Sequence, residues 1–364
     1  MTCSSFGKCG SCVLYEMDYP SQIEMKKNRL LEMFSEFDMP KLEVFSGTDS
    51  HFRARAEFRI WHDGDKSYYG MFGLKERKIV TIDECNIVDK AIANIMKPFL
   101  DEVVNNEFLR VKLYAVEFLS NSKGELIITM IYHKKWDEDE IKPHIEALKQ
   151  KFPNTDYVVR RKGKKVFIDK NYLIEELNIK DKIYKYKMIE ATFTQPNREM
   201  NKKMITWAMD NSENLSGDLV EMYCGHGNFT IPMASKFRKV IATEIAQQSI
   251  DAAFYNADIN GVDNITFLAM SAADFARLKD ENSPLLAKYN LKNILVDPPR
   301  AGLDDKSRKF TNSFDNIIYI SCNPETLKRD LETLSKSRKI KAFALFDQFP
   351  WTNHMECGVI LEKI

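Results

Sequence analysis

Long hydrophobic runs, net charge and internal repeats are all missing from this 364-residue sequence. The longest apolar stretches, such as IITMIY from Ile127, fall far short of the roughly 20 residues that cross a bilayer. The opening residues, MTCSSFGKCGSC, contain no apolar signal core, so we expect a cytoplasmic protein that does not contact membranes. Basic and acidic residues balance at 53 each, which argues against a non-specific nucleic-acid coat but allows a local basic face. Nothing in the sequence indicates an obligate protein partner.

The chain is longer than one ordinary core requires, which predicts two domains. Residues 52–61 alternate between apolar and polar side chains and predict a half-buried strand of a mixed sheet. From Asn197 onward, strand-like and helix-like segments alternate, which predicts a parallel sheet with helices on both faces. The last two strand candidates, 341–346 and 356–361, should form an antiparallel hairpin because their connection is too short for a crossover helix. We place the domain boundary near residue 190, between regions 1–190 and 191–364.

Cysteines are few, odd in number at seven, and unevenly placed. In a cytoplasmic protein such thiols are more often ligands, nucleophiles or core residues than disulfides. Cys3, Cys9 and Cys12 crowd the N-terminus, and together with the distant Cys85 they form a set of four thiolates. Such a set can hold an iron–sulfur cluster or zinc. The alternative is a frayed terminus with spare thiols.

A basic stretch lies between Arg160 and Lys187, where ten lysines and arginines stand against four acids. Aromatic residues are interleaved with these cations, which suits RNA, because cations bind phosphates while rings stack on unpaired bases. From charge alone, a solvated loop and strand edge is an equally good interpretation. The aromatic residues are Tyr157, Phe167, Tyr172, Tyr184 and Tyr186.

An apolar strand runs into a Gly-x-Gly turn at residues 219–229, LVEMYCGHGNF. Glycines let the backbone turn sharply and approach a ligand closely. About one strand later, Glu244 supplies a carboxylate that can accept hydrogen bonds from two ribose hydroxyls. The incomplete glycine pattern argues against a dinucleotide and favours a nucleoside ligand without a pyrophosphate, such as S-adenosylmethionine. A tight strand–helix turn without a ligand is the alternative.

Three further motifs follow predicted strand ends: DPPRAGL from Asp297, ISCNP around Cys322, and DQFPWTNHME, which ends on Glu356. Ligands bind at the carboxyl ends of strands in open parallel sheets, so we expect this thiol and these two carboxylates to converge. A lone cysteine is more often a buried structural thiol. Cys322, however, precedes a helix that starts with proline, and a helix N-terminus lowers the pKa of a thiol.

These motifs, with FTQPN at residues 193–197, resemble the uracil-C5 RNA methyltransferases over nearly the whole chain, and especially the members that act on tRNA. The resemblance implies an α/β fold: a Rossmann-like class I S-adenosylmethionine methyltransferase domain after an N-terminal α+β RNA-binding domain. It implies that Cys322 is the nucleophile and Glu356 the general base. The implied cofactor-contacting residues are Gln195, Tyr223, Asn228, Glu244 and Asp297.

The implied reaction is methylation of carbon 5 of the T-loop uridine of tRNA, giving ribothymidine, with tmRNA as a further candidate substrate. A thiolate adds to carbon 6, carbon 5 takes the methyl group, and a base removes the proton from carbon 5. The uridine must first be flipped out of its loop.

The cysteine set leaves a second substrate open, because some rRNA-modifying members carry a cluster of the 4Fe–4S type with this spacing. The alternative is therefore a 23S rRNA uracil-C5 methyltransferase with an iron–sulfur cluster. A third possibility, a cluster-bearing RNA-binding module without catalysis, is opposed by the intact Cys322 and Glu356. We give more weight to tRNA, because residues 52–61 resemble the tRNA enzymes and a metal site can be gained or lost without altering the RNA surface.

Overall fold

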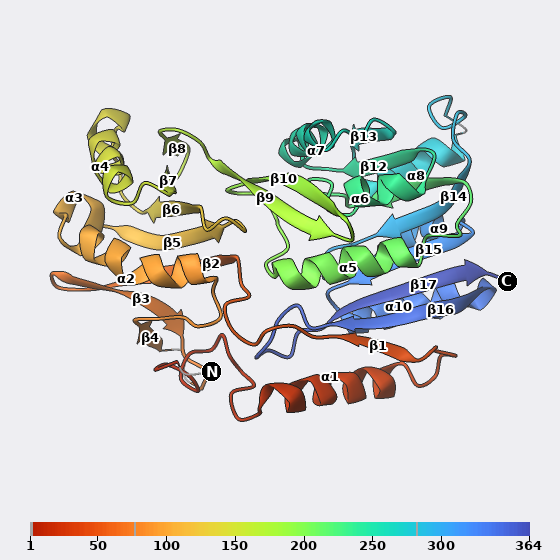
Figure 1. Cartoon of the computed structure of the whole chain (residues 1–364), viewed down its shortest axis with the longest axis horizontal. Helices are drawn as coiled ribbons and strands as arrows, with labels where there is room; N and C mark the ends of the chain where they lie inside the picture. The colour runs from red at the N-terminus through yellow and green to blue at the C-terminus, as the bar shows by residue number, and fades with distance from the viewer. Residues whose placement is uncertain (1–2, 76–77, 282) are drawn as a thin grey trace.

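Two β-sheets form the two halves of the molecule, and a two-stranded hairpin lies between them (Figure 1). The computed structural model describes residues 3–75, 78–281 and 283–364. The N-terminal half is a seven-stranded sheet in the order β4-β3-β2-β5-β6-β7-β8. Its strands are β2 (Arg55–Asp63), β3 (Lys66–Phe72), β4 (Ile79–Ile82), β5 (Leu113–Ser120), β6 (Leu126–Tyr132), β7 (Thr155–Arg161) and β8 (Lys164–Phe167). Its helices are α2 (Lys90–Val104), α3 (Glu107–Arg110) and α4 (Glu138–Lys151).

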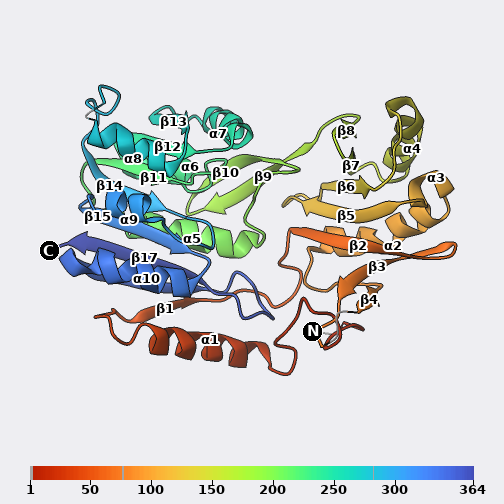
Figure 2. The ribbon, with the colours of Figure 1, turned by 180° about the vertical axis from the view of Figure 1, so that it is seen from behind.

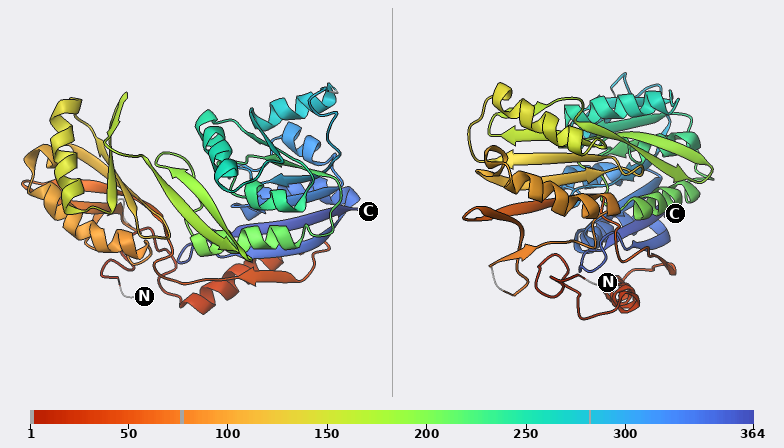
Figure 3. Two further views of the ribbon diagram at one scale, coloured as in Figure 1. Left: turned by 45° about the horizontal axis from the view of Figure 1, so that its top comes forward. Right: turned by 60° about the vertical axis from the view of Figure 1, so that its left-hand side comes forward.

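Strand β2 shows why this sheet has one dry face and one open face. Phe58 and Ile60 point into the core that α2 and α4 close, whereas Arg55 and Arg59 point to the other side. The predicted alternation over this strand is therefore confirmed. The open face turns toward the second half of the molecule, as the left view of Figure 3 shows.

The second half is an eight-stranded sheet in the order β1-β16-β17-β15-β14-β11-β12-β13. Five of its neighbouring pairs are parallel, and only β17 runs against its neighbours. Its strands are β1 (Leu42–Phe45), β11 (Asp218–Met222), β12 (Val240–Glu244), β13 (Ile265–Ala269), β14 (Leu291–Val296), β15 (Asn316–Ser321), β16 (Arg338–Phe346) and β17 (Glu356–Lys363). The predicted α/β, Rossmann-like fold and the terminal antiparallel hairpin are confirmed.

Helices cover both faces of this second sheet (Figure 2). One face packs against α1, α8, α9 and α10, and the other against α5, α6 and α7. No helix within the described ranges is both long and apolar enough to cross a bilayer. The helices are α1 (Tyr19–Met33), α5 (Arg198–Asp210), α6 (Thr230–Met233), α7 (Gln247–Ile259), α8 (Ala272–Asp280), α9 (Asp305–Thr311) and α10 (Pro324–Leu334), with short 3₁₀ turns at Ala234–Lys236 and Ser335–Ser337.

The hairpin of β9 (Tyr172–Ile179) and β10 (Lys182–Ile189) packs against both halves. Its Leu173 and Met188 meet an apolar patch of the N-terminal sheet, whereas its other end packs beneath α5. Arg198, the first residue of α5, ties these parts together. Its guanidinium pairs with Glu175 of β9 and with Asp89 before α2.

The first 45 residues depart from the predicted division at residue 190. Strand β1 pairs in parallel with β16, and α1 packs on the same sheet through Leu30 and Phe34. Region 1–190 therefore contributes one helix and one strand to the second sheet. The reason is that β16 offers a free edge, and the apolar side of α1 covers the core beside that edge.

Candidate active site

Cys322 and Glu356 lie opposite each other on neighbouring strands. In the antiparallel pair of β15 and β17, Ser321 is the partner of Cys357, so the next residue of β15 faces the preceding residue of β17. The carboxyl end of β15 thereby meets the first residue of β17. Sequence reasoning expected the two side chains at this edge, and the strand register brings them together.

Three of the predicted cofactor-contacting residues follow along the same edge. Asp297 comes directly after β14, Tyr223 after β11, and Glu244 ends β12. Since the sheet order is β17-β15-β14-β11-β12, these residues form a row that starts at Glu356 and ends at Glu244. The predicted nucleophile and base occupy one end of the row, and the nucleoside-binding turn occupies the other.

The thiol of Cys322 is partly exposed to a cavity of about 290 Å³ that Arg29, Arg300 and His354 also line. Burial, together with the nearby Glu356 and Asp297, raises the pKa of Cys322 to about 11, whereas Arg300 lowers it. The lowering expected from the start of α10 therefore does not bring this pKa below its ordinary value. Desolvation and two carboxyls outweigh the helix terminus and the guanidinium.

Three buried carboxyl groups at the second sheet have raised pKa values, and two of them, Glu356 and Asp297, lie near the thiol. Burial and the neighbouring Asp297 hold the pKa of Glu356 well above its usual range. Desolvation raises the pKa of Asp297 to about 7. The third group is Glu221 on β11, whose pKa burial raises to about 8. Asp297 and Glu221 therefore gain and lose protons near neutral pH, and buried acids with perturbed pKa values are typical of acid–base sites.

Glu221 was not singled out from the sequence. The one available signal was a carboxylate within the otherwise apolar strand sequence LVEMY. A fully buried acid of this kind is uncommon unless it has a partner or a function. Here one oxygen of Glu221 has no hydrogen-bond partner, so the side chain can still accept a donor from a ligand.

The backbone in and just before the Gly-x-Gly turn adopts a left-handed conformation at three residues. Tyr223, Gly225 and Gly227 have φ values of 64°, 54° and 87°, in the left-handed region. The carboxylate of Glu244 accepts hydrogen bonds from the backbone N–H of Gly225 at 3.3 Å and of Ala246 at 2.9 Å. Glu244 is thereby fixed beside the turn, where its carboxylate can accept hydrogen bonds from ribose hydroxyls.

Gln195 and Asn228 lie on the α5 side of the sheet, where they line one small cavity. Asn228 and Asn201 of α5 exchange two amide hydrogen bonds, at 2.8 and 2.9 Å. Gln195 accepts a hydrogen bond of 2.6 Å from Gln348, in the loop between β16 and β17. The structure therefore brings these two amides together, apart from the row of side chains on the strand ends.

The predicted metal site is not formed. No three or more histidine, cysteine or acidic side chains are arranged to hold a metal ion in the part of the chain that the structure describes. All four cysteines are free thiols, and Cys3, Cys9 and Cys85 are near enough to contribute to a raised pKa of Cys12. Burial is the larger cause, because Cys12 lies in the apolar core of the N-terminal half and Cys85 packs against that core. The spacing suggested ligands, but these two thiols are core residues.

The basic stretch contains a cavity of about 740 Å³ that is lined by cations. Its lining includes Lys134, Lys135, Arg160, Arg161 and Lys162. Most of the interleaved tyrosines do not accompany these cations as stacking surfaces. Three of these five aromatic residues are buried in the cores, because alternate residues of β7 and β10 face inward; these are Tyr157, Tyr184 and Tyr186. The exposed rings on this half of the molecule include Trp61 and Phe167.

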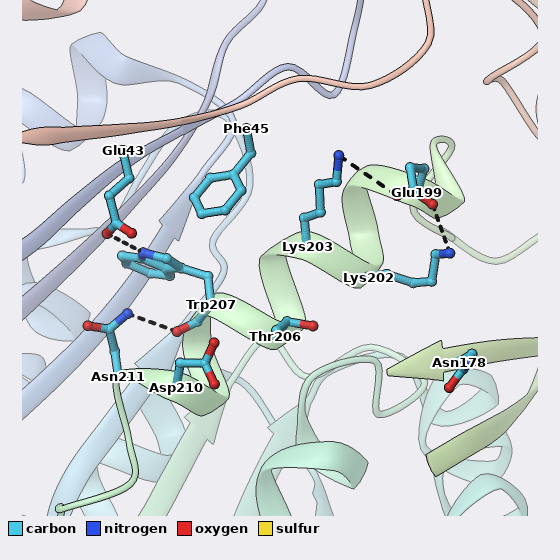
Figure 4. Close-up of a pocket in the computed structure, with 10 residues that line it drawn as sticks. All are labelled: Glu43, Phe45, Asn178, Glu199, Lys202, Lys203, Thr206, Trp207, Asp210 and Asn211. Carbon is cyan, nitrogen blue, oxygen red and sulfur yellow. Dashed lines mark hydrogen bonds and ion pairs between the residues drawn. The ribbon is translucent and has the colours of Figure 1, made fainter. Parts of the chain in front are cut away.

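A separate cavity of about 460 Å³ lies between α5, β1 and β9 (Figure 4). Its charged groups are paired within the protein: Lys202 with Glu199, and the indole of Trp207 with Glu43. None of the predicted site residues lines it. It offers no free charge of the kind found around Cys322.

Comparison with known proteins gives a consistent result. Residues 18–364 match the family model described as tRNA (Uracil-5-)-methyltransferase. A protein of Nautilia profundicola named tRNA/tmRNA (uracil-C(5))-methyltransferase is 69% identical over 365 residues and covers 100% of both chains. One with the same name from Aliivibrio fischeri is 42% identical, over 96% of this chain and 99% of its own.

A solved structure supports the fold. The Pyrococcus abyssi tRNA (uracil-54, C5)-methyltransferase in complex with S-adenosyl-L-homocysteine matches with a TM-score of 0.73. It is 24% identical and covers 96% of this chain and 85% of its own. At this identity the likeness concerns the architecture alone.

Proposed function

The chain belongs to the tRNA (uracil-5-)-methyltransferase family, and from that premise we propose that it methylates carbon 5 of the T-loop uridine of tRNA. The methyl donor is S-adenosylmethionine, the product is ribothymidine, and tmRNA is a second substrate of the same chemistry. The protein acts in the cytoplasm, where these RNAs are found. A 23S rRNA uracil-C5 methyltransferase with an iron–sulfur cluster is the less favoured alternative. The relatives are named tRNA/tmRNA (uracil-C(5))-methyltransferase, and the described cysteines are not arranged to hold a metal ion.

The observation that carries the proposed chemistry is the pairing of β15 with β17. It sets one thiol and one buried carboxyl face to face at the edge where a parallel sheet binds its ligands. A thiol that adds to a ring and a base that later removes a proton must both reach the same small heterocycle. The register of β15 and β17 places Cys322 and Glu356 close enough to contact the same ring.

Cys322 acts first. Its sulfur, as the thiolate, forms a bond to carbon 6 of the flipped uracil, and the ring electrons move onto carbon 5 and the carbonyl at carbon 4. The raised pKa of this thiol keeps it protonated in the resting protein, so as the uracil enters, the thiol proton passes to a neighbouring carboxylate such as Asp297 or to water. The guanidinium of Arg300, which favours the thiolate, lies at the same cavity.

Glu356 acts last. After carbon 5 has received the methyl group, it carries both a methyl and a proton. The Glu356 carboxylate takes that proton, the electron pair restores the ring double bond, and the bond from carbon 6 to sulfur breaks. The raised pKa of Glu356 makes it a stronger base than an exposed glutamate once it is ionised.

The cofactor half of the site fits a nucleoside with a sulfonium side chain. The Glu244 carboxylate accepts hydrogen bonds from the ribose hydroxyls. The left-handed turn at Tyr223 to Gly227 lets the backbone approach the cofactor closely. Asp297, Gln195 and Asn228 offer further polar contacts on either side of this turn. When bound there, S-adenosylmethionine supplies the electrophilic methyl group.

RNA selection is assigned to the N-terminal half and to the hairpin β9–β10. The basic cavity near Arg160 and the exposed ring of Trp61 suit phosphates and unpaired bases. Both lie in the half whose open sheet face turns toward the catalytic half, so a folded RNA loop can contact both (Figure 3).

The test uses labelled S-adenosylmethionine with unmodified transcripts of a T-arm hairpin, a tmRNA fragment and 23S rRNA fragments. Label is expected at carbon 5 of one T-loop uridine, and none with the Cys322→Ala protein, which should still bind the cofactor. Label in the rRNA fragments alone would assign the chain to the alternative substrate. Equal turnover by the Cys322→Ala protein would reject the covalent mechanism.

A further inference from the structure

A buried lysine of the first helix holds the loop that leads to Glu356. Lys26 of α1 has an exposed fraction of 0%. Its ammonium donates to Oδ1 of Asp347 at 2.6 Å and to the carbonyl oxygen of Phe349 at 3.1 Å. Both acceptors belong to residues 347–355, the segment between β16 and β17. The nucleophile and the base do not use this lysine directly.

Two more residues of α1 contact the same loop. The hydroxyl of Tyr19 donates to Oδ2 of Asp347 at 2.8 Å, so both oxygens of that carboxylate are occupied. The side-chain oxygen of Gln22 accepts a hydrogen bond of 2.9 Å from the backbone N–H of Trp351. Tyr19, Gln22 and Lys26 are spaced by three and four residues and share one side of the helix.

The loop needs an external support at these points. Trp351 has a φ of 66°, a left-handed conformation that costs free energy for a residue with a side chain. Asp347 leaves the sheet directly after β16, and the chain must then turn and re-enter at the first residue of β17. His354 and Met355, in the last turn, line the cavity that holds Cys322. A shift of the loop is therefore transmitted to the start of β17.

We propose that Lys26 is a positioning residue for the general base: by fixing Asp347 and the Phe349 carbonyl, it sets where the Glu356 carboxylate stands relative to carbon 5 of the bound uracil. This assignment rests on the proposed function. Lys26 touches neither the uracil nor the methyl donor. Its effect passes through the loop to the step in which the proton on carbon 5 is removed.

A role in stability alone explains the arrangement less well. A buried ion pair is often no more stabilising than apolar side chains of the same volume. Three hydrogen-bonding side chains directed at one nine-residue loop instead restrict its geometry, as the support of a catalytic carboxylate requires. Burial lowers the pKa of Lys26, and the neighbouring Asp347 carboxylate partly offsets this lowering.

The decisive experiment compares two RNAs, one with uridine and one with 5-fluorouridine at the target. With 5-fluorouridine, carbon 5 carries fluorine in place of the proton, so the adduct accumulates without any need for the base. Lys26→Met should form this fluorinated adduct at a rate within threefold of wild type. With uridine, it should release product at least tenfold more slowly and accumulate a denaturation-resistant protein–RNA adduct. Lys27→Met, on the same helix, is the matched control and should stay within twofold on both RNAs, because the side chain of Lys27 is 37% exposed and pairs, among the described residues, with Glu24.

The double variant Lys26→Met with Asp347→Asn separates positioning from folding. It removes the unpaired buried carboxylate, so the thermal midpoint should return most of the way to the wild-type value. Product release from the uridine adduct should remain slow. Release that recovers together with the midpoint would overturn the proposal, as would an equal loss of rate on both RNAs. Failure of the proposed function would look different, since the wild-type protein would then form no adduct with the 5-fluorouridine RNA and no product with the uridine RNA.

Discussion

Replacing Glu356 by glutamine should speed the first chemical step at Cys322 and stop the last one. The negative charge of Glu356 is the largest electrostatic contribution that raises the pKa of the thiol, second only to burial. Glutamine keeps the size of the side chain and removes this charge. The thiolate therefore becomes easier to form, whereas a glutamine amide cannot take the proton from carbon 5.

The magnitude follows from the raised pKa. A thiol with a pKa of about 11 is ionised in about one molecule in a thousand at pH 8, against about one in ten for the ordinary value of 9.0. Loss of one nearby unit charge shifts a buried pKa by about one unit, so the thiolate fraction of Glu356→Gln should rise by up to about tenfold in the pH range where the wild-type Glu356 carboxyl is ionised. Below the pKa, the reaction rate of the thiol should rise about tenfold for each pH unit, in wild type and variant alike.

The assay measures alkylation of Cys322 by iodoacetamide, read by mass spectrometry of the peptide, between pH 7 and pH 10 without RNA. Arg300→Gln provides the opposite sign, because its guanidinium lowers the pKa of the thiol. The expected order of rates at pH 8 is Glu356→Gln, then wild type, then Arg300→Gln. With RNA and cofactor, Glu356→Gln should trap the adduct. Slower alkylation of this variant would refute the electrostatic reasoning, and product release at the wild-type rate would refute its role as the base.

Two further predictions concern the cofactor turn and the junction between the halves. Glu244→Gln should weaken S-adenosylmethionine binding at least tenfold by calorimetry while leaving the alkylation rate of Cys322 unchanged, since Glu244 lies at the far end of the row; unchanged affinity would remove Glu244 from the nucleoside site. Arg198→Met should lower the free energy of unfolding by about 3 kcal/mol in urea titrations, because it leaves the buried Glu175 and the nearby Asp89 without their partner. A loss below about 1 kcal/mol would mean that solvent replaces the guanidinium at this junction.

The strand ends of the second half could be predicted from the sequence because their signals are local. Each strand is a short apolar run, and the residue types that chemistry needs follow it directly, as Asp297 follows β14 and Cys322 follows β15. In an open parallel sheet all such ends meet at one edge. Knowledge of which segments are strands therefore places these residues together without any long-range information.

The failures involve information that spacing along the chain does not contain. Apolar residues at helical spacing between Tyr19 and Phe37 predict a helix, but not that it packs on a sheet strand that holds Phe343. The spacing of Cys3, Cys9 and Cys12 is compatible with metal ligation, but the direction of each side chain depends on the core that surrounds it. The four tyrosines of the basic stretch were counted by composition, whereas strand alternation buries three of them, Tyr157, Tyr184 and Tyr186.

The direction of strand β17 decides whether Glu356 lies near Cys322. In a sheet whose strands all ran in parallel, the first residue of a strand would lie at the edge opposite to Cys322. Because β17 is reversed, its first residue, Glu356, reaches the edge where β15 ends, and the proposed catalytic pair depends on this single reversal. A reversal needs a tight return loop, and this one includes a strained residue, Trp351. The loop is fixed from outside the sheet by Lys26 and Gln22, so a helix from the start of the chain supports the proposed catalytic centre although it carries none of the proposed catalytic residues.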